Sequence, residues 1–148
     1  MSVAEAEAVA PTLHVVTVND LPRVWSFIEP VLAKACADSQ GEFTPEAILA
    51  AMGVHDGVER MRLLVLERGD VQAVMGVCVT ARADGTRIME CVLAGGADAR
   101  EWPDVDEQID EIAREWGCTK LRIPCARKGW HKVLPHWKLV GYVMERSV

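Results

Sequence analysis

The stretch that decides the fold lies near the C-terminus and runs Gly117-Cys118-Thr119-Lys120-Leu121-Arg122-Ile123-Pro124-Cys125-Ala126-Arg127-Lys128-Gly129-Trp130. Gly117 follows an amphipathic pattern and predicts the C-terminal cap of a helix. Residues 119–123 then predict a short strand. A basic Arg-Lys-Gly-Trp turn leads into a last short helix over residues 128–137. This succession is typical of a β-α-β crossover in a mixed sheet.

The residues before this stretch predict a long helix and three strands. Over about residues 104–116 one face of the helix is apolar, formed by Val105, Ile109, Ile112, Ala113 and Trp116. Residues 61–67, 71–80 and 87–93 predict strands that are joined by turns at 69–70 and 83–85. We expect these strands to form an antiparallel meander in the middle of the chain.

The N-terminal half predicts one strand followed by two helices. Residues 13–18 form the strand, and Asp20 is placed to cap the first helix, which Pro30 is expected to kink or divide. Thr44 caps the second helix. A closing strand is predicted over residues 139–146. The order β-α-α-β-β-β-α-β-α-β predicts an α+β fold with a mixed, mostly antiparallel sheet flanked by helices.

Length and composition indicate one globular domain. The chain has 148 residues, 50% hydrophobic and 26% charged, which is enough for a single core. We expect residues 1–11 to form a flexible arm and residues 12–148 to form the domain. No apolar run approaches the roughly 20 residues of a membrane helix, and the N-terminus lacks the features of a secretion signal. A cytoplasmic protein with no membrane partner is therefore expected.

Charge divides the chain into two parts. The formal net charge is −6, yet residues 1–116 carry 9 basic and 21 acidic side chains, and residues 117–148 carry 7 basic and 1 acidic. The acidic balance of the whole chain argues against general nucleic-acid binding. The division favours two faces of opposite sign that suit self-association or docking, although two solvated faces would give the same counts.

The cysteines and histidines predict no metal site. The five cysteines are Cys36, Cys78, Cys91, Cys118 and Cys125. Their number is odd and no pair has CxxC spacing, which favours buried free thiols. His131 and His136 are five residues apart, so they do not share a helix face as a metal-binding pair does.

The element order and several motifs resemble the GNAT fold of acyl-CoA N-acyltransferases, and more closely a set of small phage-encoded GNAT-like proteins. The motifs are a helix with Trp25, then Trp116-Gly117-Cys118, Arg127-Lys128-Gly129-Trp130, Val133-Leu134-Pro135 and a final Gly141-Tyr142. The resemblance covers roughly residues 13–146. It implies a GNAT-like domain in the cytoplasm of a bacterial host, with incorporation in the phage particle as a further expectation.

The resemblance also implies where acetyl-CoA would bind. GNAT enzymes hold its pyrophosphate with a Gln/Arg-x-x-Gly-x-Gly/Ala turn before the long helix, where backbone N–H groups receive the anion. Gly95, Gly96 and Ala97 occupy that place here, but no Gln or Arg leads them and Asp98 stands where a donor is needed. Residues 98–115 hold eight acids and two bases, which oppose an anionic ligand. The alternative is a plain loop between strand and helix.

Glu90 and Tyr142 are the candidates for acid–base chemistry if the chain is an enzyme. An acetyltransferase needs a general base for the amine and a general acid for the leaving thiolate. Glu90 is the one carboxylate in an otherwise apolar predicted strand, and Tyr142 is the one tyrosine. Their structural alternatives are a solvent-facing strand residue and an aromatic at the edge of the core. One strand fits after the last helix, whereas GNAT enzymes usually close with two, which argues against activity.

A basic-aromatic cluster in the last segment is the candidate docking surface. Its members are Arg127, Lys128, Trp130, Lys132, Trp137 and Lys138. Trp and Arg are favoured at the centres of interfaces. The alternative is that Trp130 packs the last helix onto the sheet while the basic side chains stay solvated.

The leading hypothesis is a non-catalytic GNAT-like protein, encoded by a phage or prophage, with a structural or accessory role in virion assembly. It would act by protein–protein docking without a cofactor, and its partner would be another virion protein or a second copy of itself. The virion role rests on the resemblance. The alternative is an N-acetyltransferase that uses acetyl-CoA, with Glu90 as base. A weaker alternative is an accessory factor that binds a host protein.

Overall fold

The computed structural model describes residues 10–39, 41–55, 58–59, 61–96, 105–124, 130–134, 136–141 and 144–148. The predicted N-terminal arm lies almost wholly outside these ranges. The strands are β1 (Thr12–Val16), β2 (Val54–His55), β3 (Val58–Glu59), β4 (Arg62–Arg68), β5 (Asp70–Ala81), β6 (Arg87–Gly95) and β7 (Lys120–Arg122). The helices are η2 (Val18–Asp20), α1 (Leu21–Asp38), α2 (Pro45–Met52), α3 (Asp106–Glu115) and α4 (Trp130–Val133).

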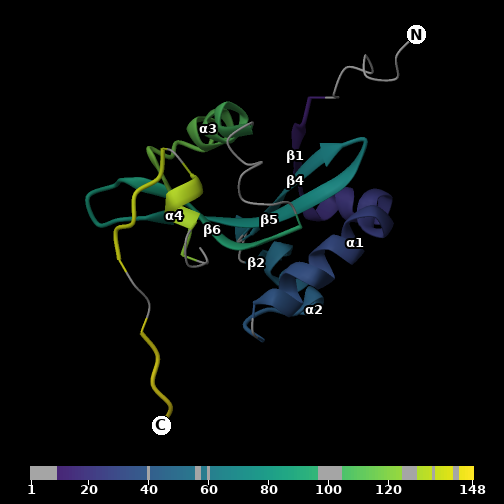
Figure 1. The fold of residues 1–148 in the computed structure, drawn as a ribbon, viewed down its shortest axis with the longest axis horizontal. Coiled ribbons are helices and arrows are strands. Elements are labelled where there is room, and N and C mark those ends of the chain that lie inside the picture. Colours follow the sequence, from purple (N-terminus) through teal and green to yellow (C-terminus); the bar gives the residue numbers. More distant parts are fainter. Residues whose placement is uncertain are drawn as a thin grey trace.

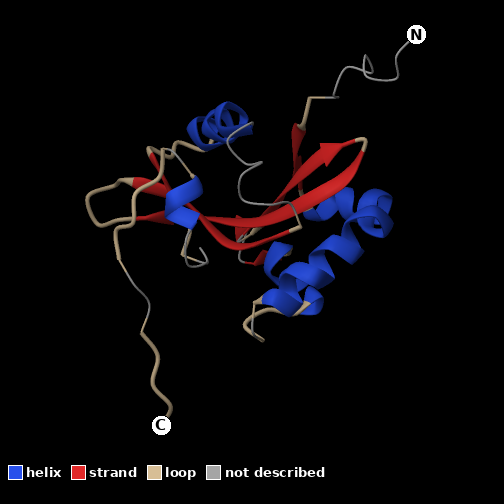
Figure 2. Cartoon of the chain, in the orientation of Figure 1, coloured by secondary structure: helices blue, strands red, loops and turns tan. Residues whose placement is uncertain are grey.

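A five-stranded sheet in the order β1-β4-β5-β6-β7 forms the centre of the molecule. Its strands pair antiparallel except β6 and β7, which are parallel. β2 and β3 form a small separate sheet that the sequence did not predict. Helices α1 and α2 cover one face of the large sheet, and α3 and α4 lie on the other (Figures 1 and 2). The predicted α+β fold with a mixed, mostly antiparallel sheet is confirmed.

The face under α1 and α2 has a closely packed core. Ile28, Leu32 and Ala35 of α1 are at most 1% exposed, and Ile48 and Met52 of α2 are fully buried. Their partners on the sheet include Leu63, Val65, Val74 and Leu93. Close packing of this kind makes each buried methylene count toward stability.

The first helix is continuous, and its start differs from the prediction. α1 runs from Leu21 to Asp38 with Pro30 inside it, so Pro30 does not divide the helix. Asp20 stands at the N-cap position, but its carboxylate bonds no N–H of α1. Its Oδ2 accepts hydrogen bonds from the backbone N–H and the hydroxyl of Thr17, at 3.0 and 3.1 Å. These bonds lower the pKa of Asp20, and they make the predicted cap wrong because η2 turns the carboxylate away from α1.

The predicted caps at the start of α2 and at the end of α3 agree with the structure. The Oγ1 atom of Thr44 accepts a hydrogen bond from the backbone N–H of Ala47 at 3.1 Å, which caps α2. At the end of α3, Gly117 has a φ of +73°, and the N–H of Cys118 bonds the carbonyl of Ala113 at 2.8 Å. This is the hydrogen-bond pattern of a glycine-terminated helix.

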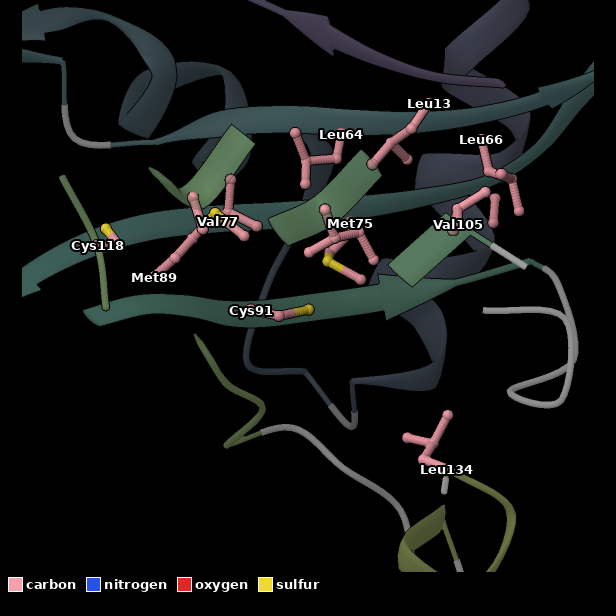
Figure 3. Close-up of a cluster of buried hydrophobic side chains, with 13 residues drawn as sticks. Leu13, Leu64, Leu66, Met75, Val77, Met89, Cys91, Val105, Cys118 and Leu134 are labelled. Carbon is pink, nitrogen blue, oxygen red and sulfur yellow. The ribbon is translucent and has the colours of Figure 1, made fainter. Parts of the chain in front are cut away.

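Helix α3 packs on its face of the sheet with the predicted apolar stripe. Val105, Ile109 and Ala113 are buried against strand residues of the same core, such as Leu64 and Val77. Figure 3 shows Leu64 and Val77 in this cluster together with Val105, and Leu134 lies apart from them, close to α4. The amide of Gln108 adds a polar tie, since its Oε1 accepts from the N–H of Leu13 at 2.9 Å and its Nε2 donates to the carbonyl of Pro11 at 3.2 Å.

The chain after α4 leaves the body of the domain. Leu139, Val140 and Met144 are 51%, 72% and 93% exposed, and the tail runs away from the sheet in Figure 1. The closing strand predicted over residues 139–146 is therefore wrong for the described part of that stretch, because no neighbouring strand pairs with it. Within the described ranges, no helix is both long and apolar enough to cross a membrane.

Candidate functional site

The parallel strands β6 and β7 pair only at one end. Their ladder begins where Ile88 lies opposite Lys120 and ends where Glu90 lies opposite Arg122. β6 continues to Gly95, whereas β7 stops at Arg122. In the described part of the chain, the last residues of β6 therefore have no strand beside them on the β7 side. An open edge of this kind can offer backbone N–H and C=O groups to an extended ligand.

A β-bulge in β6 decides which side chains face which layer. Gly76 lies opposite Leu93 and Val77 lies opposite Cys91, so Val92 is the extra residue. Before the bulge, Cys91 belongs to the core under α3, and after it Leu93 belongs to the core under α1 and α2. Because of the bulge, Cys91 and Leu93, which would face the same side in a regular strand, pack in opposite cores.

A small pocket lies over this part of β6, on the side of α3 and α4. Its lining residues are Met75, Cys91, Ala94, Asp106, Ile109, Ile123, Trp130, Leu134 and Trp137. The enclosed volume is about 20 Å³, which is room for about one water molecule. Trp130 and Trp137 are partly buried and pack against the core under α3. The indole rings of Trp130 and Trp137 therefore form part of the lining of a pocket that is too small for more than a water molecule.

Glu90 lies at the point where β7 ends, on the opposite face from the pocket. Its neighbour Cys91 faces α3, so the alternation of the strand turns Glu90 toward the α1 side. The hydroxyl of Thr80 donates a hydrogen bond to Glu90 Oε1 at 2.7 Å. Arg122 Nη1 lies 3.6 Å from the same oxygen, and 20% of the Glu90 side chain is exposed. Glu90 is thus a positioned carboxylate rather than a freely solvated one.

Cys78 shares this face with Glu90. The two residues lie directly opposite each other on β5 and β6. Burial raises the pKa of the Cys78 thiol, and the negative charge of Glu90 raises it further. The group formed by Thr80, Cys78, Glu90 and Arg122 therefore places a thiol, a hydroxyl, a carboxylate and a guanidinium on three adjacent strands.

The two glycines at the end of β6 have a packing role in this structure. A Cβ atom on Gly95 would lie 2.5 Å from the Cβ of Ala35 in α1, and one on Gly96 would collide with the carbonyl of Gln72. Gly96 also has a φ of +103°, which favours glycine. The close approach of α1 and β5 is therefore sufficient to require both glycines. Ala97, the third residue of the predicted phosphate turn, lies outside the described residues.

The predicted docking residues divide into packed and solvated groups. Trp130 and Trp137 pack on the core under α3, whereas Lys132 and Lys138 are exposed. Arg127 and Lys128 lie outside the described residues, as does Tyr142, the predicted acid. Within the described part, the cluster is therefore an indole layer against α3 with lysines on the solvent side.

Two polar features of the site were not predicted from the sequence: the contacts that hold Glu90, and Asp106 in the pocket lining. Arg122 and Thr80 hold Glu90, and no spacing in the sequence connects these three residues. Asp106 was counted among the acids near a helix start, but it lines the pocket. Burial raises the pKa of Asp106, the nearby Asp110 raises it further, and His136 acts in the opposite direction. An acid at the first position of an amphipathic helix was the one available signal in the sequence.

The described thiols form no disulfide and no metal group. Cys36, Cys91 and Cys118 are buried and Cys78 is half-buried, and none of these four is part of a disulfide among the described residues, as predicted. Cys125 lies outside the described residues. No group of three or more His, Cys, Asp or Glu side chains in the described ranges is arranged to hold a metal ion.

Comparison with known proteins gives a structural likeness only. The chain matches no protein-family model, and no curated protein matches its sequence. Among solved structures it resembles a ribosomal-protein-alanine N-acetyltransferase from Brucella melitensis biovar Abortus 2308, with a TM-score of 0.62 and 12% identity over 94% of this chain and 98% of that one.

Two further solved structures share this likeness. An aminoglycoside acetyltransferase from an uncultured soil metagenomic sample, in complex with trehalose, has a TM-score of 0.61 and 11% identity over 94% of this chain and 97% of that chain. A GNAT family acetyltransferase from Staphylococcus aureus subsp. aureus USA300_TCH1516 has a TM-score of 0.57 and 9% identity over 93% and 99%. Identities this low establish architecture and not activity. The chain has the GNAT-like α+β fold.

Proposed function

We propose that this protein is an N-acetyltransferase that uses acetyl-CoA as its acetyl donor. The observation that carries the proposal is the placement of Glu90. In a fold shared with acetyltransferases, it puts one positioned carboxylate at the point where the two parallel strands separate. A general base must be held within reach of the proton that it removes, and the contacts from Thr80 and Arg122 hold this carboxylate.

Glu90 has the chemistry that acetyl transfer to an amine requires. The amine nitrogen attacks the thioester carbonyl carbon, the carbon–sulfur bond breaks, and the nitrogen loses a proton that a carboxylate can accept. The departing thiolate gains a proton, and Tyr142 remains the predicted donor. Arg122 and Thr80 are positioning residues for Glu90, because they contact the carboxylate and keep its rotamer.

The donor would lie along the open edge of β6. The acyl-carrying arm of CoA is an extended chain with amide groups, which suits the backbone edge beyond Glu90. The enclosed pocket beside that edge has a volume of about 20 Å³, so Trp130 and Trp137 must shift to admit the arm. Residues 97–104, where a pyrophosphate would be expected, lie outside the described residues.

Calorimetric titration with acetyl-CoA at low ionic strength tests donor binding, since salt would screen weak phosphate contacts. Gly96→Glu is a poor negative control because it would disturb α1 and β5. Ala94→Phe is better, because it places a ring in the pocket. Ala81→Phe, at an exposed position of β5, is the matched variant. We expect saturable binding that Ala94→Phe abolishes and Ala81→Phe preserves. An absence of heat at millimolar acetyl-CoA would overturn the proposal.

A rate measurement tests the role of Glu90. Release of the CoA thiol is followed with a panel of primary amines, from amino acids to peptide N-termini. We expect Glu90→Gln to lower kcat/KM by about 10²–10⁴-fold, the range for loss of a general base. Arg122→Gln is the matched control, since it removes the ion pair but keeps the carboxylate. It should retain most of the maximal rate, because the carboxylate that accepts the proton is still present. Equal losses in both variants would assign Glu90 a structural role.

A non-catalytic docking protein is the second candidate, and the small size of the pocket is the observation that favours it. A chain that binds no CoA has no need of a large pocket, and this one has a volume of about 20 Å³ with two indole rings in its lining. Exposed Lys132 and Lys138 would then contact an acidic partner surface. A phage or prophage origin and a virion role remain predictions from the resemblance. This candidate is supported if acetyl-CoA fails to bind the folded protein.

A further inference from the structure

We propose that the acceptor of this protein is a free α-amino acid, whose ammonium group pairs with Glu90 and whose carboxylate pairs with Arg122. The inference rests on the proposed function, because it takes Glu90 as the group that receives the acceptor amine. It adds the class of acceptor and gives Arg122 a second role, that of selecting this acceptor. The feature that carries it is a carboxylate and a guanidinium that lie side by side on adjacent strands.

Glu90 uses only one of its two carboxylate oxygens for contacts with described residues. The hydroxyl of Thr80 donates a hydrogen bond to Oε1 at 2.7 Å, and Nη1 of Arg122 lies 3.6 Å from the same atom. Among the residues that the structure describes, none forms a hydrogen bond or an ion pair with Oε2. An ionised carboxylate has about four acceptor sites, and 20% of this side chain is exposed. Glu90 can therefore accept further hydrogen bonds from an ammonium group.

Arg122 also has donors that its contact with Glu90 does not use. At 3.6 Å, the ion pair is longer than a hydrogen bond, and no described residue accepts a hydrogen bond from this guanidinium. Its five N–H groups form a planar fork that matches a carboxylate with two parallel hydrogen bonds. The side chain is 39% exposed, so a carboxylate that arrives from solvent can reach it.

The two charges are as close together as the two charges of an α-amino acid require. Glu90 and Arg122 lie directly opposite each other on the parallel strands β6 and β7. In a free α-amino acid, the ammonium group and the carboxylate are attached to the same carbon atom, so both can meet their opposite charge in one orientation. A peptide N-terminus has an amide in place of this carboxylate, and a polyamine has a second positive charge that Arg122 repels. The pair therefore favours the free amino acid over both.

An NMR titration of the full chain without acetyl-CoA tests the binding of the acceptor. The ligands are common L-amino acids and the corresponding amino-acid amides, which keep the ammonium group and the side chain but lack the carboxylate. We expect Arg122→Gln to weaken the binding of amino acids about 10–100-fold, the loss for a charged hydrogen-bonding partner, and to leave the weaker binding of the amides unchanged. Arg122→Lys keeps the charge without the fork and should recover part of the affinity.

Lys120→Gln is the matched control. Lys120 is an exposed cation on the same face of β7, two residues before Arg122 and opposite Ile88. Its substitution removes the same charge and should change amino-acid affinity by less than about threefold, because exposed charges contribute little. The NMR spectrum of each variant also shows whether the domain is folded.

Steady-state rates with acetyl-CoA separate this inference from the proposed function. We expect Arg122→Gln to raise KM for amino acids by the same factor, with little change in kcat and none for the amides. Acetyl transfer that shows no preference for the carboxylate would keep the transferase and overturn the amino-acid acceptor, as would equal effects of Arg122→Gln and Lys120→Gln. Amino-acid binding that depends on Arg122 without any acetyl transfer would support the site and refute the transferase. If no amino acid binds and none is acetylated, the inference is wrong.

Discussion

The two faces of the sheet are covered by very different amounts of helix. On one face, α1 and α2 have 18 and 8 residues, and on the other, α3 and α4 have 10 and 4. The largest side chains under α1 and α2 are almost fully buried, as Leu32 and Met52 show. Under α3 and α4 the core ends in two partly buried tryptophans and a small pocket.

The difference indicates that the two helix layers contribute unequally to the stability of the domain. A long helix with a continuous apolar stripe contributes most of the stabilising burial, because it removes a large apolar area from water. A four-residue helix cannot hold its position by its own hydrogen bonds, so α4 depends on Trp130 and its neighbours for its place. The α1–α2 face is therefore the more closely packed part of the domain, and the α3–α4 face is the less closely packed part.

The largest expected effect is a contrast between two leucine truncations. We expect Leu32→Ala to cost about 2–5 kcal/mol of unfolding free energy, because its surroundings in α1 cannot collapse into the cavity. Leu134→Ala on the other face should cost less than about 2 kcal/mol, since the short α4 segment can relax. Urea unfolding of both variants measures the difference. Equal costs would mean that the two faces are equally rigid.

A smaller effect is expected where β6 touches α1. Gly95→Ala places a methyl group 2.5 Å from the Cβ of Ala35, and overpacking of this kind costs about 1–3 kcal/mol. Ala35→Gly in the same chain should recover part of this loss, which a double-mutant cycle in urea detects. Gly141→Ala, with nothing within 4 Å, is the control and should change stability by less than about 0.5 kcal/mol. Without recovery, the clash with the α1 backbone would account for most of the loss.

The smallest effect concerns thiol chemistry on the α1 side. Burial and the charge of Glu90 raise the pKa of Cys78, so the unreactive thiol dominates at neutral pH and alkylation accelerates as pH rises. Glu90→Gln removes the negative charge, lowers this pKa and should speed iodoacetamide labelling of Cys78 about two- to threefold. Peptide mass spectrometry measures the rate. Cys36, whose pKa is raised by burial and by Glu46, is the internal control and should not respond.

Much of the fold follows from local patterns in the sequence. The apolar stripe of α3, the cap at Thr44 and the glycine at 117 each act within a few residues, and the structure has each of them where it was predicted. The turns that separate β4, β5 and β6 are local in the same sense. Their order along the chain was sufficient to predict the mixed sheet and its helices.

Features that depend on distant partners were not predictable in this way. The segment after residue 138 finds no strand to pair with among the described residues. The contact between Glu90 and Arg122 joins residues 32 positions apart, and it exists only because β6 and β7 are parallel neighbours. The spacing of residues in a single sequence cannot predict a contact of this kind.

Hydrophobic periodicity, capping residues and turn residues thus specified the main helices and the strands of the large sheet, and their order, because each of these patterns acts within one or two turns of the backbone. Tertiary packing decided the rest. The bulge at Val92 assigned β6 side chains to opposite cores, and the close approach of α1 required Gly95. The early end of β7 left a positioned carboxylate and a short sheet edge. These outcomes depend on how whole elements meet, where volume and hydrogen-bond pairing across the sheet set the result.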